Sequence, residues 1–223
     1  MHHEKWVSKD YIVAWAASFL LTSNFYLYMV TTSGYALHTF GVSTVLAGLS
    51  TSIFVLAAIV TRLIMGGRIF HVGCIRALSL GLGLNAVFSA CYFFTGSYGL
   101  LLAVRIMHGL SIGIASTAIF TVGSVLIPKN KTGIGMGYFS LSTTLGTAVG
   151  PFVAAALTRS GSYTSLFTVT LIAAVLNVCL IPFIKLNNAN LPDPRSLTKP
   201  LKGLAGIIDT KELPVAIICG IAF

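Results

Sequence analysis

Charged side chains are scarce in this sequence. Only 9% of its 223 residues are Asp, Glu, Lys or Arg, whereas an average soluble domain carries about 25%. Five residues are acidic, and none of them lies between Tyr11 and Ile184. Since hydrophobic residues make up 56% of the chain, this deficit excludes an ordinary water-soluble domain and indicates a chain whose solvent is mostly lipid.

Cysteine and catalytic side chains are also sparse. The four cysteines lie far apart, which excludes a disulfide scaffold and metal-ligand spacing, and we interpret them as small buried hydrophobes: they are Cys74, Cys91, Cys179 and Cys219. No cluster of His and Glu, no Ser/His/Asp set and no phosphate-binding loop stands out. We therefore expect a protein that is not an enzyme and that uses neither a metal nor an organic cofactor.

The formal net charge of +9 could suggest a nucleic-acid partner. A phosphate-binding surface, however, needs its basic residues gathered on one face or along one helix. Here the Lys and Arg residues lie in the gaps between apolar runs. This distribution is typical of membrane topology, so no nucleic-acid partner is expected.

Six long apolar runs occupy most of the chain. A hydrocarbon core about 30 Å thick needs about 20 apolar residues in a helix. Each run is continuous and does not alternate in ten-residue segments, which favours membrane-spanning helices over a barrel. The runs cover Tyr11–Ser33, Val45–Met65, Ala77–Phe94, Gly99–Leu126, Gly133–Leu157 and Ser165–Ile184.

The basic residues assign the two sides of the membrane. Of the fourteen Lys and Arg residues, Arg159 alone falls on one side and Arg105 lies inside the fourth run. The other side carries the remaining twelve: Lys5, Lys9, Arg62, Arg68, Arg76, Lys129, Lys131, Lys185, Arg195, Lys199, Lys202 and Lys211. By the positive-inside rule, the N-terminus is cytoplasmic in a multi-pass protein of the plasma membrane.

The sequence changes character after the sixth run. We predict an N-terminal six-helix domain over residues 1–184 and a polar, proline-containing cytoplasmic linker over 185–210. Residues 211–223 then open a new apolar run, Pro214–Phe223, whose ten residues cannot span a bilayer. We interpret it as the start of a seventh helix, and we expect the chain to lack a C-terminal half.

Arg105 lies within the fourth apolar run, followed by His108 and Gly109. A charged side chain inside the membrane is costly and usually serves function or faces water, although an arginine near a helix end can extend to the interface. His108 is either a buried histidine with satisfied hydrogen bonds or a proton carrier. Gly109 would let a neighbouring helix approach closely.

Two further segments have distinctive glycine spacing. In the fifth run, Gly146 and Gly150 share one helix face and Pro151 follows, which predicts a tight helix contact and a kink. Between the second and third runs, Gly66 and Gly73 permit a tight turn, and Arg76 suits a cytoplasmic loop. A short basic inside loop would explain the charges but not the glycine spacing.

These segments give the chain its resemblance to a known family. The loop from Gly66 to Arg76, the Arg105-to-Gly109 segment and the Gly146-to-Pro151 segment resemble, at their expected places, three signatures of the major facilitator superfamily. The resemblance covers essentially the whole chain and implies the N-terminal six-helix half of a transporter. Such a half is an all-α membrane bundle built as an inverted 3+3 repeat.

The chain departs from the family pattern at several places. Phe70 and His71 replace the Asp-Arg pair of the loop signature, and Cys74 and Ile75 replace paired basic residues. The charge network that this aspartate normally joins is therefore in doubt. Many drug exporters of this family also keep a carboxylate in the first span, where this chain offers Asn24.

The resemblance implies secondary transport by alternating access around a site between two halves. The first and fourth spans would line the cavity, with Asn24, Tyr28, Arg105 and His108 as candidate lining or coupling residues and Arg105 favouring an anionic or polar group. The fifth-span motif favours an antiporter that exports a small organic molecule against protons carried by His108 or by an acid of the missing half. Uptake of a metabolite or sugar, and a non-transporting membrane module, remain the alternatives.

Overall fold

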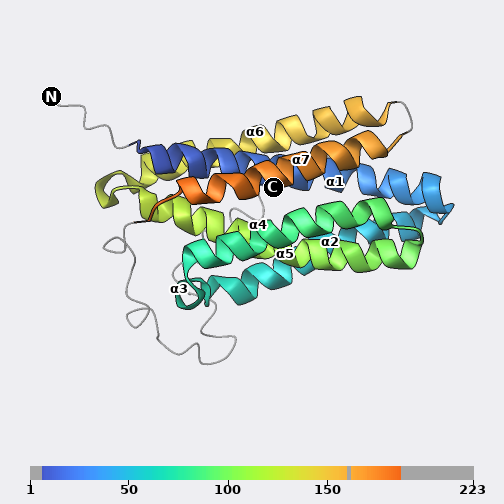
Figure 1. Cartoon of the computed structure of the whole chain (residues 1–223), viewed down its shortest axis with the longest axis horizontal. Helices are drawn as coiled ribbons and strands as arrows, with labels where there is room; N and C mark the ends of the chain where they lie inside the picture. Colours follow the sequence, from blue (N-terminus) through green and yellow to red (C-terminus); the bar gives the residue numbers. More distant parts are fainter. Residues whose placement is uncertain (1–6, 160–161, 187–223) are drawn as a thin grey trace, which may run out of the picture. The chain divides into compact units, whose positions relative to one another are not determined.

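The structure, a computed structural model, describes residues 7–159 and 162–186. Within these ranges the chain is helical and contains no strand (Figure 1). The described residues belong to one compact unit. The predicted linker after Lys185 and the predicted seventh helix lie almost entirely outside the described residues, so the domain boundaries stay predictions.

Six helices of the described ranges are long and apolar enough to cross a membrane, which confirms the six predicted spans. A short helix, α3, joins the second span to the third, and single 3-10 turns extend α4 and α7 and precede α6. The helices are α1 (Lys9–Phe40), α2 (Thr44–Gly66), α3 (Ile69–Val72), α4 (Cys74–Cys91), α5 (Tyr98–Leu126), α6 (Thr132–Thr158) and α7 (Thr164–Leu180).

Helix α1 is longer than its apolar run predicts. The run is broken after Ser33 by polar and glycine residues, but the helix continues to Phe40. The hydroxyls of Thr31 and Thr32 donate to carbonyls one turn earlier, at 2.7 and 2.6 Å, so these side chains stay in the helix without a polar partner elsewhere. Gly41 ends it in the left-handed conformation, with φ of 61°.

The helices that begin at α1, α2 and α5 share one start signal. Ser8, Ser43 and Ser97 are their N-caps, and each hydroxyl accepts a hydrogen bond from the backbone N–H three residues later. Such a cap satisfies one of the four N–H groups that a helix start leaves unpaired. This matters at a membrane boundary because lipid offers these groups no partner.

The six long helices form two layers of three. In one layer α1 lies between α6 and α7, and in the other α5 lies between α2 and α4, while α1 and α5 contact each other between the layers (Figure 1). The first three spans are α1, α2 and α4, and the last three are α5, α6 and α7. Each layer thus combines the first span of one triplet with the second and third of the other, as an inverted 3+3 repeat requires.

The two sides of this double layer differ. On one side α4 and α7 pack against each other. On the other side α2 and α6 make at most slight contact, although both pack extensively on the central helices. The bundle is therefore closed along the α4–α7 side and open along the α2–α6 side.

Glycines allow the close contact of α5 with α2. A Cβ atom on Gly109 would meet the carbonyl oxygen of Phe54, and one on Gly113 would lie 2.7 Å from the carbonyl oxygen of Ala58. Both glycines are on one face of α5, one turn apart. Their missing side chains bring the two backbones together, which places the Arg105 side chain directly against α2.

The predicted glycine contact of α6 is present against α1. A Cβ atom on Gly146 would lie 2.8 Å from Cβ of Thr22, and one on Gly150 would lie 2.8 Å from the carbonyl oxygen of Ser23. Pro151 follows inside the helix, which runs without interruption from Thr132 to Thr158. A kink at Pro151 stays a prediction.

The loop signature residues occupy the short connection around α3. Gly73 has a φ of 92°, which side-chain-bearing residues rarely adopt, so this turn requires glycine. Gly66 ends α2 and has open space where a Cβ atom would be. His71 and Arg76 are exposed. Of the two predicted turn positions, Gly73 therefore requires glycine and Gly66 does not.

We predict that Gly150→Ala destabilises the bundle by about 1–3 kcal/mol, because an added methyl group would overlap the backbone of α1. The matched control is Gly137→Ala on the same helix, where a Cβ atom would meet nothing within 4 Å. That control is expected to keep or raise stability, by about 0.5–1 kcal/mol, because alanine is the better helix former. Melting temperatures of the two purified variants in detergent measure the difference, and equal values would contradict the close packing.

Candidate functional site

Arg105 is fully buried between the two layers of the bundle. Its Nε atom donates a hydrogen bond of 2.8 Å to the carbonyl oxygen of Ser50 on α2, and its Nη1 atom donates one of 3.3 Å to the hydroxyl of Tyr92. The guanidinium also lies over the ring of Phe54, 4.0 Å from its centroid. A carbonyl, a hydroxyl and an aromatic face thus hold the charge.

No carboxylate faces this arginine in the part of the chain that the structure describes. Asp10 is the one acidic residue of those ranges, and its carboxylate accepts a hydrogen bond from the backbone N–H of Lys185 at 2.7 Å. Among the described residues, Nη2 of Arg105 has no hydrogen-bond partner. The guanidinium is therefore a buried positive charge that its own surroundings do not neutralise.

His108 continues the hydrogen bonds that begin at Arg105. Its Nε2 atom lies 2.7 Å from Oδ1 of Asn85, and its Nδ1 atom lies 3.2 Å from the Tyr92 hydroxyl. Since Oδ1 only accepts, Nε2 carries the proton and Nδ1 accepts from Tyr92. The order is then Arg105 to Tyr92 to His108 to Asn85, with one hydrogen bond at each step, and we call these four side chains the polar chain.

The sequence did not single out two members of the polar chain. Tyr92 lies where α4 passes into a 3-10 turn, and Asn85 lies within α4. Both come from the third span, which lacked a family signature. An asparagine in the middle of an apolar run is the signal that could have identified Asn85, because a buried polar side chain requires a partner.

Tyr28 and Asn24 lie on the α7 side of the same interior. The Tyr28 ring stacks on Tyr92 at 4.5 Å, and its hydroxyl accepts a hydrogen bond of 2.8 Å from Thr170. Asn24 Nδ2 donates to the Thr170 carbonyl oxygen at 3.0 Å. The structure therefore gathers Tyr28, Arg105 and His108 around Tyr92, and it places Asn24 one turn away along α1.

A hollow of about 340 Å³ lies on the open α2–α6 side, between α1, α2, α5 and α6. Hydroxyl groups and aromatic rings make up much of its wall, and one charged side chain, Arg62, lies among them. We call it the central hollow. Its lining residues are Ser18, Leu21, Thr22, Phe25, Tyr26, Arg62, Ile112, Ser116, Ile119, Phe120, Thr143 and Thr147.

Arg62 lies within α2, four residues before Gly66, and so near the connection that contains α3. Its Nε atom donates a hydrogen bond of 3.0 Å to Oγ of Ser116 on α5. The Ser116 hydroxyl in turn donates to the carbonyl oxygen of Gly113 at 3.3 Å. The serine thus directs a lone pair at Arg62 and holds the guanidinium against the wall of the central hollow.

None of the four residues predicted to line a cavity belongs to the central hollow. Asn24, Tyr28, Arg105 and His108 are all buried within the bundle. One aromatic connection links the two regions: Phe25, in the wall of the hollow, packs on Phe54 at 5.3 Å between ring centroids, and Phe54 carries the Arg105 guanidinium. A role of the four residues in transport or coupling stays a prediction.

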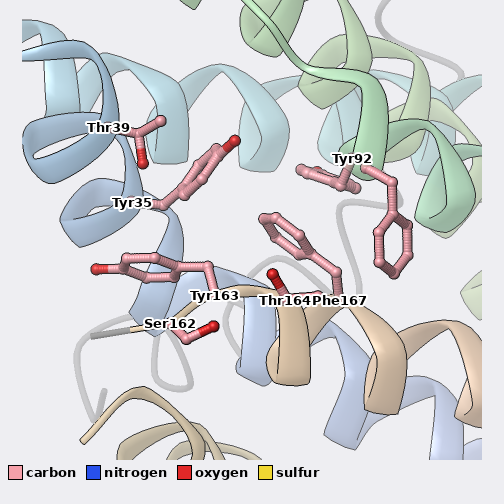
Figure 2. Close-up of a pocket in the computed structure, with 8 residues that line it drawn as sticks. Tyr35, Thr39, Tyr92, Ser162, Tyr163, Thr164 and Phe167 are labelled. Atoms are coloured by element: carbon pink, nitrogen blue, oxygen red, sulfur yellow. The ribbon is translucent and has the colours of Figure 1, made fainter. Parts of the chain in front are cut away.

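A second pocket, of about 350 Å³, lies where α1 ends and α7 begins. Figure 2 shows the rings of Tyr35, Tyr92, Tyr163 and Phe167 around it. The Tyr35 ring packs edge-on against Tyr163 and against Phe167, at 5.1 Å each. Tyr35, Tyr92 and Phe167 belong to one hydrophobic core cluster, so this pocket is a gap at the edge of the aromatic packing.

The six membrane-crossing helices form two layers, and each layer combines spans from both triplets. The bundle is open along one side. These features define a multi-pass helical membrane protein with an inverted repeat. A family model described as Major Facilitator Superfamily matches residues 14–223. The chain belongs to the Major Facilitator Superfamily.

Two curated relatives are similar to this chain. The staphylopine export protein of Staphylococcus aureus is 30% identical over 144 residues, which cover 62% of this chain and 34% of that protein. The uncharacterized MFS-type transporter Rv1250 of Mycobacterium tuberculosis is 24% identical over 134 residues, or 60% of this chain and 23% of that protein. The matched stretch thus spans about a third or less of each relative.

We predict that Tyr92→Phe destabilises the protein by about 1–3 kcal/mol, because it removes the acceptor of Arg105 Nη1 and the donor to His108 in one step. Tyr163→Phe is the matched control, since its hydroxyl makes no hydrogen bond within the described residues. Melting temperatures in detergent report the effect. A Tyr92→Phe variant as stable as the control would show that the polar chain contributes nothing to the fold.

Proposed function

We propose that this chain is the N-terminal half of a secondary active transporter that exports a small organic molecule across the plasma membrane by alternating access. The central hollow carries the proposal, because it lies on the open side of an inverted-repeat bundle, along the first, second, fourth and fifth spans. A second six-helix half facing this side would close a cavity around it. Family membership supports transport, and no catalytic group or cofactor is needed for it.

Two observations support export over uptake. One is the similarity of this chain to a protein whose name is staphylopine export protein. The other is the Gly146-to-Pro151 segment, which resembles an antiporter signature and packs tightly on α1. The basic residues of the even-to-odd loops support a cytoplasmic N-terminus.

Everted membrane vesicles from cells that express the complete reading frame containing residues 1–223 test this proposal. Vesicles with an acidified lumen are offered cationic, neutral and anionic aromatic compounds, and their contents are measured by mass spectrometry. We expect at least one compound to accumulate beyond vesicles without the protein. Accumulation of none would reject transport, and accumulation only in right-side-out vesicles would favour uptake.

Proton coupling follows as a second part of the proposal. Residues Tyr11 to Ile184 contain no carboxylate, and both ring nitrogens of His108 are already used in the polar chain. A proton on His108 would place a second positive charge on the hydroxyl that already binds Arg105. We therefore propose that the proton carrier is an acid outside residues Tyr11 to Ile184 and that His108 holds the polar chain together.

We predict that the exporter loses accumulation when a protonophore collapses the gradient, both in the wild type and in a His108→Gln variant that still folds. The measurement compares the ratio of accumulation with and without protonophore for the two proteins. A variant that exchanges substrate but no longer responds to the gradient would identify His108 as the proton carrier instead.

A further inference from the structure

We propose that the exported molecule carries a carboxylate and that Arg62 is the residue that binds it in the central hollow. This inference rests on the proposed function, since it names the substrate class of the same site. It differs from the expectation drawn from the sequence, which assigned a preference for anionic groups to Arg105.

The first argument is the geometry of Arg62. Its side chain is exposed at the wall of the hollow, and Ser116 fixes the guanidinium through Nε. Within the described residues, Nη1 and Nη2 have no hydrogen-bond or ion-pair partner. A guanidinium held in this way offers a planar pair of donors, which matches the two oxygens of a carboxylate.

The second argument is charge. None of the residues that line the central hollow is acidic, and the one described carboxylate, that of Asp10, is bonded to the backbone of Lys185. Arg62 is thus an uncompensated positive charge in a wall that also contains apolar rings and aliphatic side chains, where an electrostatic attraction is stronger than in water. Such a wall favours an anion and disfavours a cation.

The third argument is the rest of the wall. The lining combines the aromatic residues Phe25, Tyr26 and Phe120 with hydroxyl residues such as Ser18 and Thr22. A ligand site of this kind combines apolar contact area with a few polar groups that set orientation. The chemistry that fits is a small organic acid with a flat apolar part and hydrogen-bonding groups.

A rival role for Arg62 is an ion pair with an acid of a second six-helix half. The two roles differ in what the charge recognises. A substrate-binding arginine discriminates between a carboxylate and its neutral amide, whereas an arginine that holds two halves together affects the transport of both compounds equally.

The test uses everted vesicles with the complete protein and three matched pairs: benzoate and benzamide, hippurate and hippuramide, and N-acetyltryptophan and its amide. We expect the wild type to accumulate a carboxylate at least tenfold faster than its amide. In Arg62→Gln, we expect KM for that carboxylate to rise at least tenfold while slow transport of the amide is unchanged. In Arg62→Lys, KM for the carboxylate should lie between the values of the wild type and of Arg62→Gln, because lysine keeps the charge but lacks the planar pair of N–H donors.

Two further variants complete the design. Arg68→Gln, in the loop between α2 and α3, removes an exposed arginine outside the hollow and should leave both rates unchanged. Ser116→Ala removes the group that positions Arg62 and should raise KM for the carboxylate less than Arg62→Gln does. Equal melting temperatures in detergent establish that the variants fold.

The outcomes separate this inference from the proposed function. If the wild type exports amides or cations but no carboxylate, the inference is overturned and the export function stands. If Arg62→Gln slows carboxylate and amide equally, Arg62 acts in the fold or between halves, and the inference is again overturned. If no compound of any charge accumulates, the proposed function itself fails.

Discussion

The burial of one guanidinium without a carboxylate governs the interior of this bundle. Lipid supplies no water to solvate Arg105, and no acid of the described helices faces it, so the charge depends on a carbonyl of α2, a hydroxyl of Tyr92 and the face of Phe54. These groups come from α2 and from the end of α4. The arginine can reach them only because Gly109 brings α5 against α2. Gly109 and Arg105 thus both take part in the contact between α5 and α2.

That contact also accounts for the asymmetry of the two sides. Around Tyr92, the rings of Tyr28 and Phe167 and the imidazole of His108 fill the space between the layers toward α4 and α7. This aromatic packing closes one side of the bundle. On the other side the central hollow remains between α2 and α6, and its wall combines small hydroxyl residues and Arg62 with aromatic and aliphatic side chains. The same double layer therefore has a packed interior and an open hollow.

Hydropathy alone predicted the six spans, because a membrane-crossing helix needs a length of apolar residues that no other element uses. The family signatures led to Arg105, Gly109, Gly146 and Gly150, and all three glycines lie in close helix contacts. The facing of each helix was not predictable, because a helix that is apolar all round shows no period. For that reason neither the place of Arg62 in the wall of the central hollow nor the partners of His108 on α4 were foreseen.

The two arginines of the spans carry the same charge in different surroundings. Arg105 is enclosed, and its partners are parts of the fold, so its charge cannot meet a solute without opening the layers. Arg62 is held by one serine at an accessible wall, and its Nη1 and Nη2 atoms have no hydrogen-bond partner among the described residues. In a segment without carboxylates, an accessible cation can be neutralised only by a group that comes from outside these helices. A ligand that supplies this group gains most when the hollow is closed, because closure removes competing water, and binding would then favour the closed arrangement of the bundle.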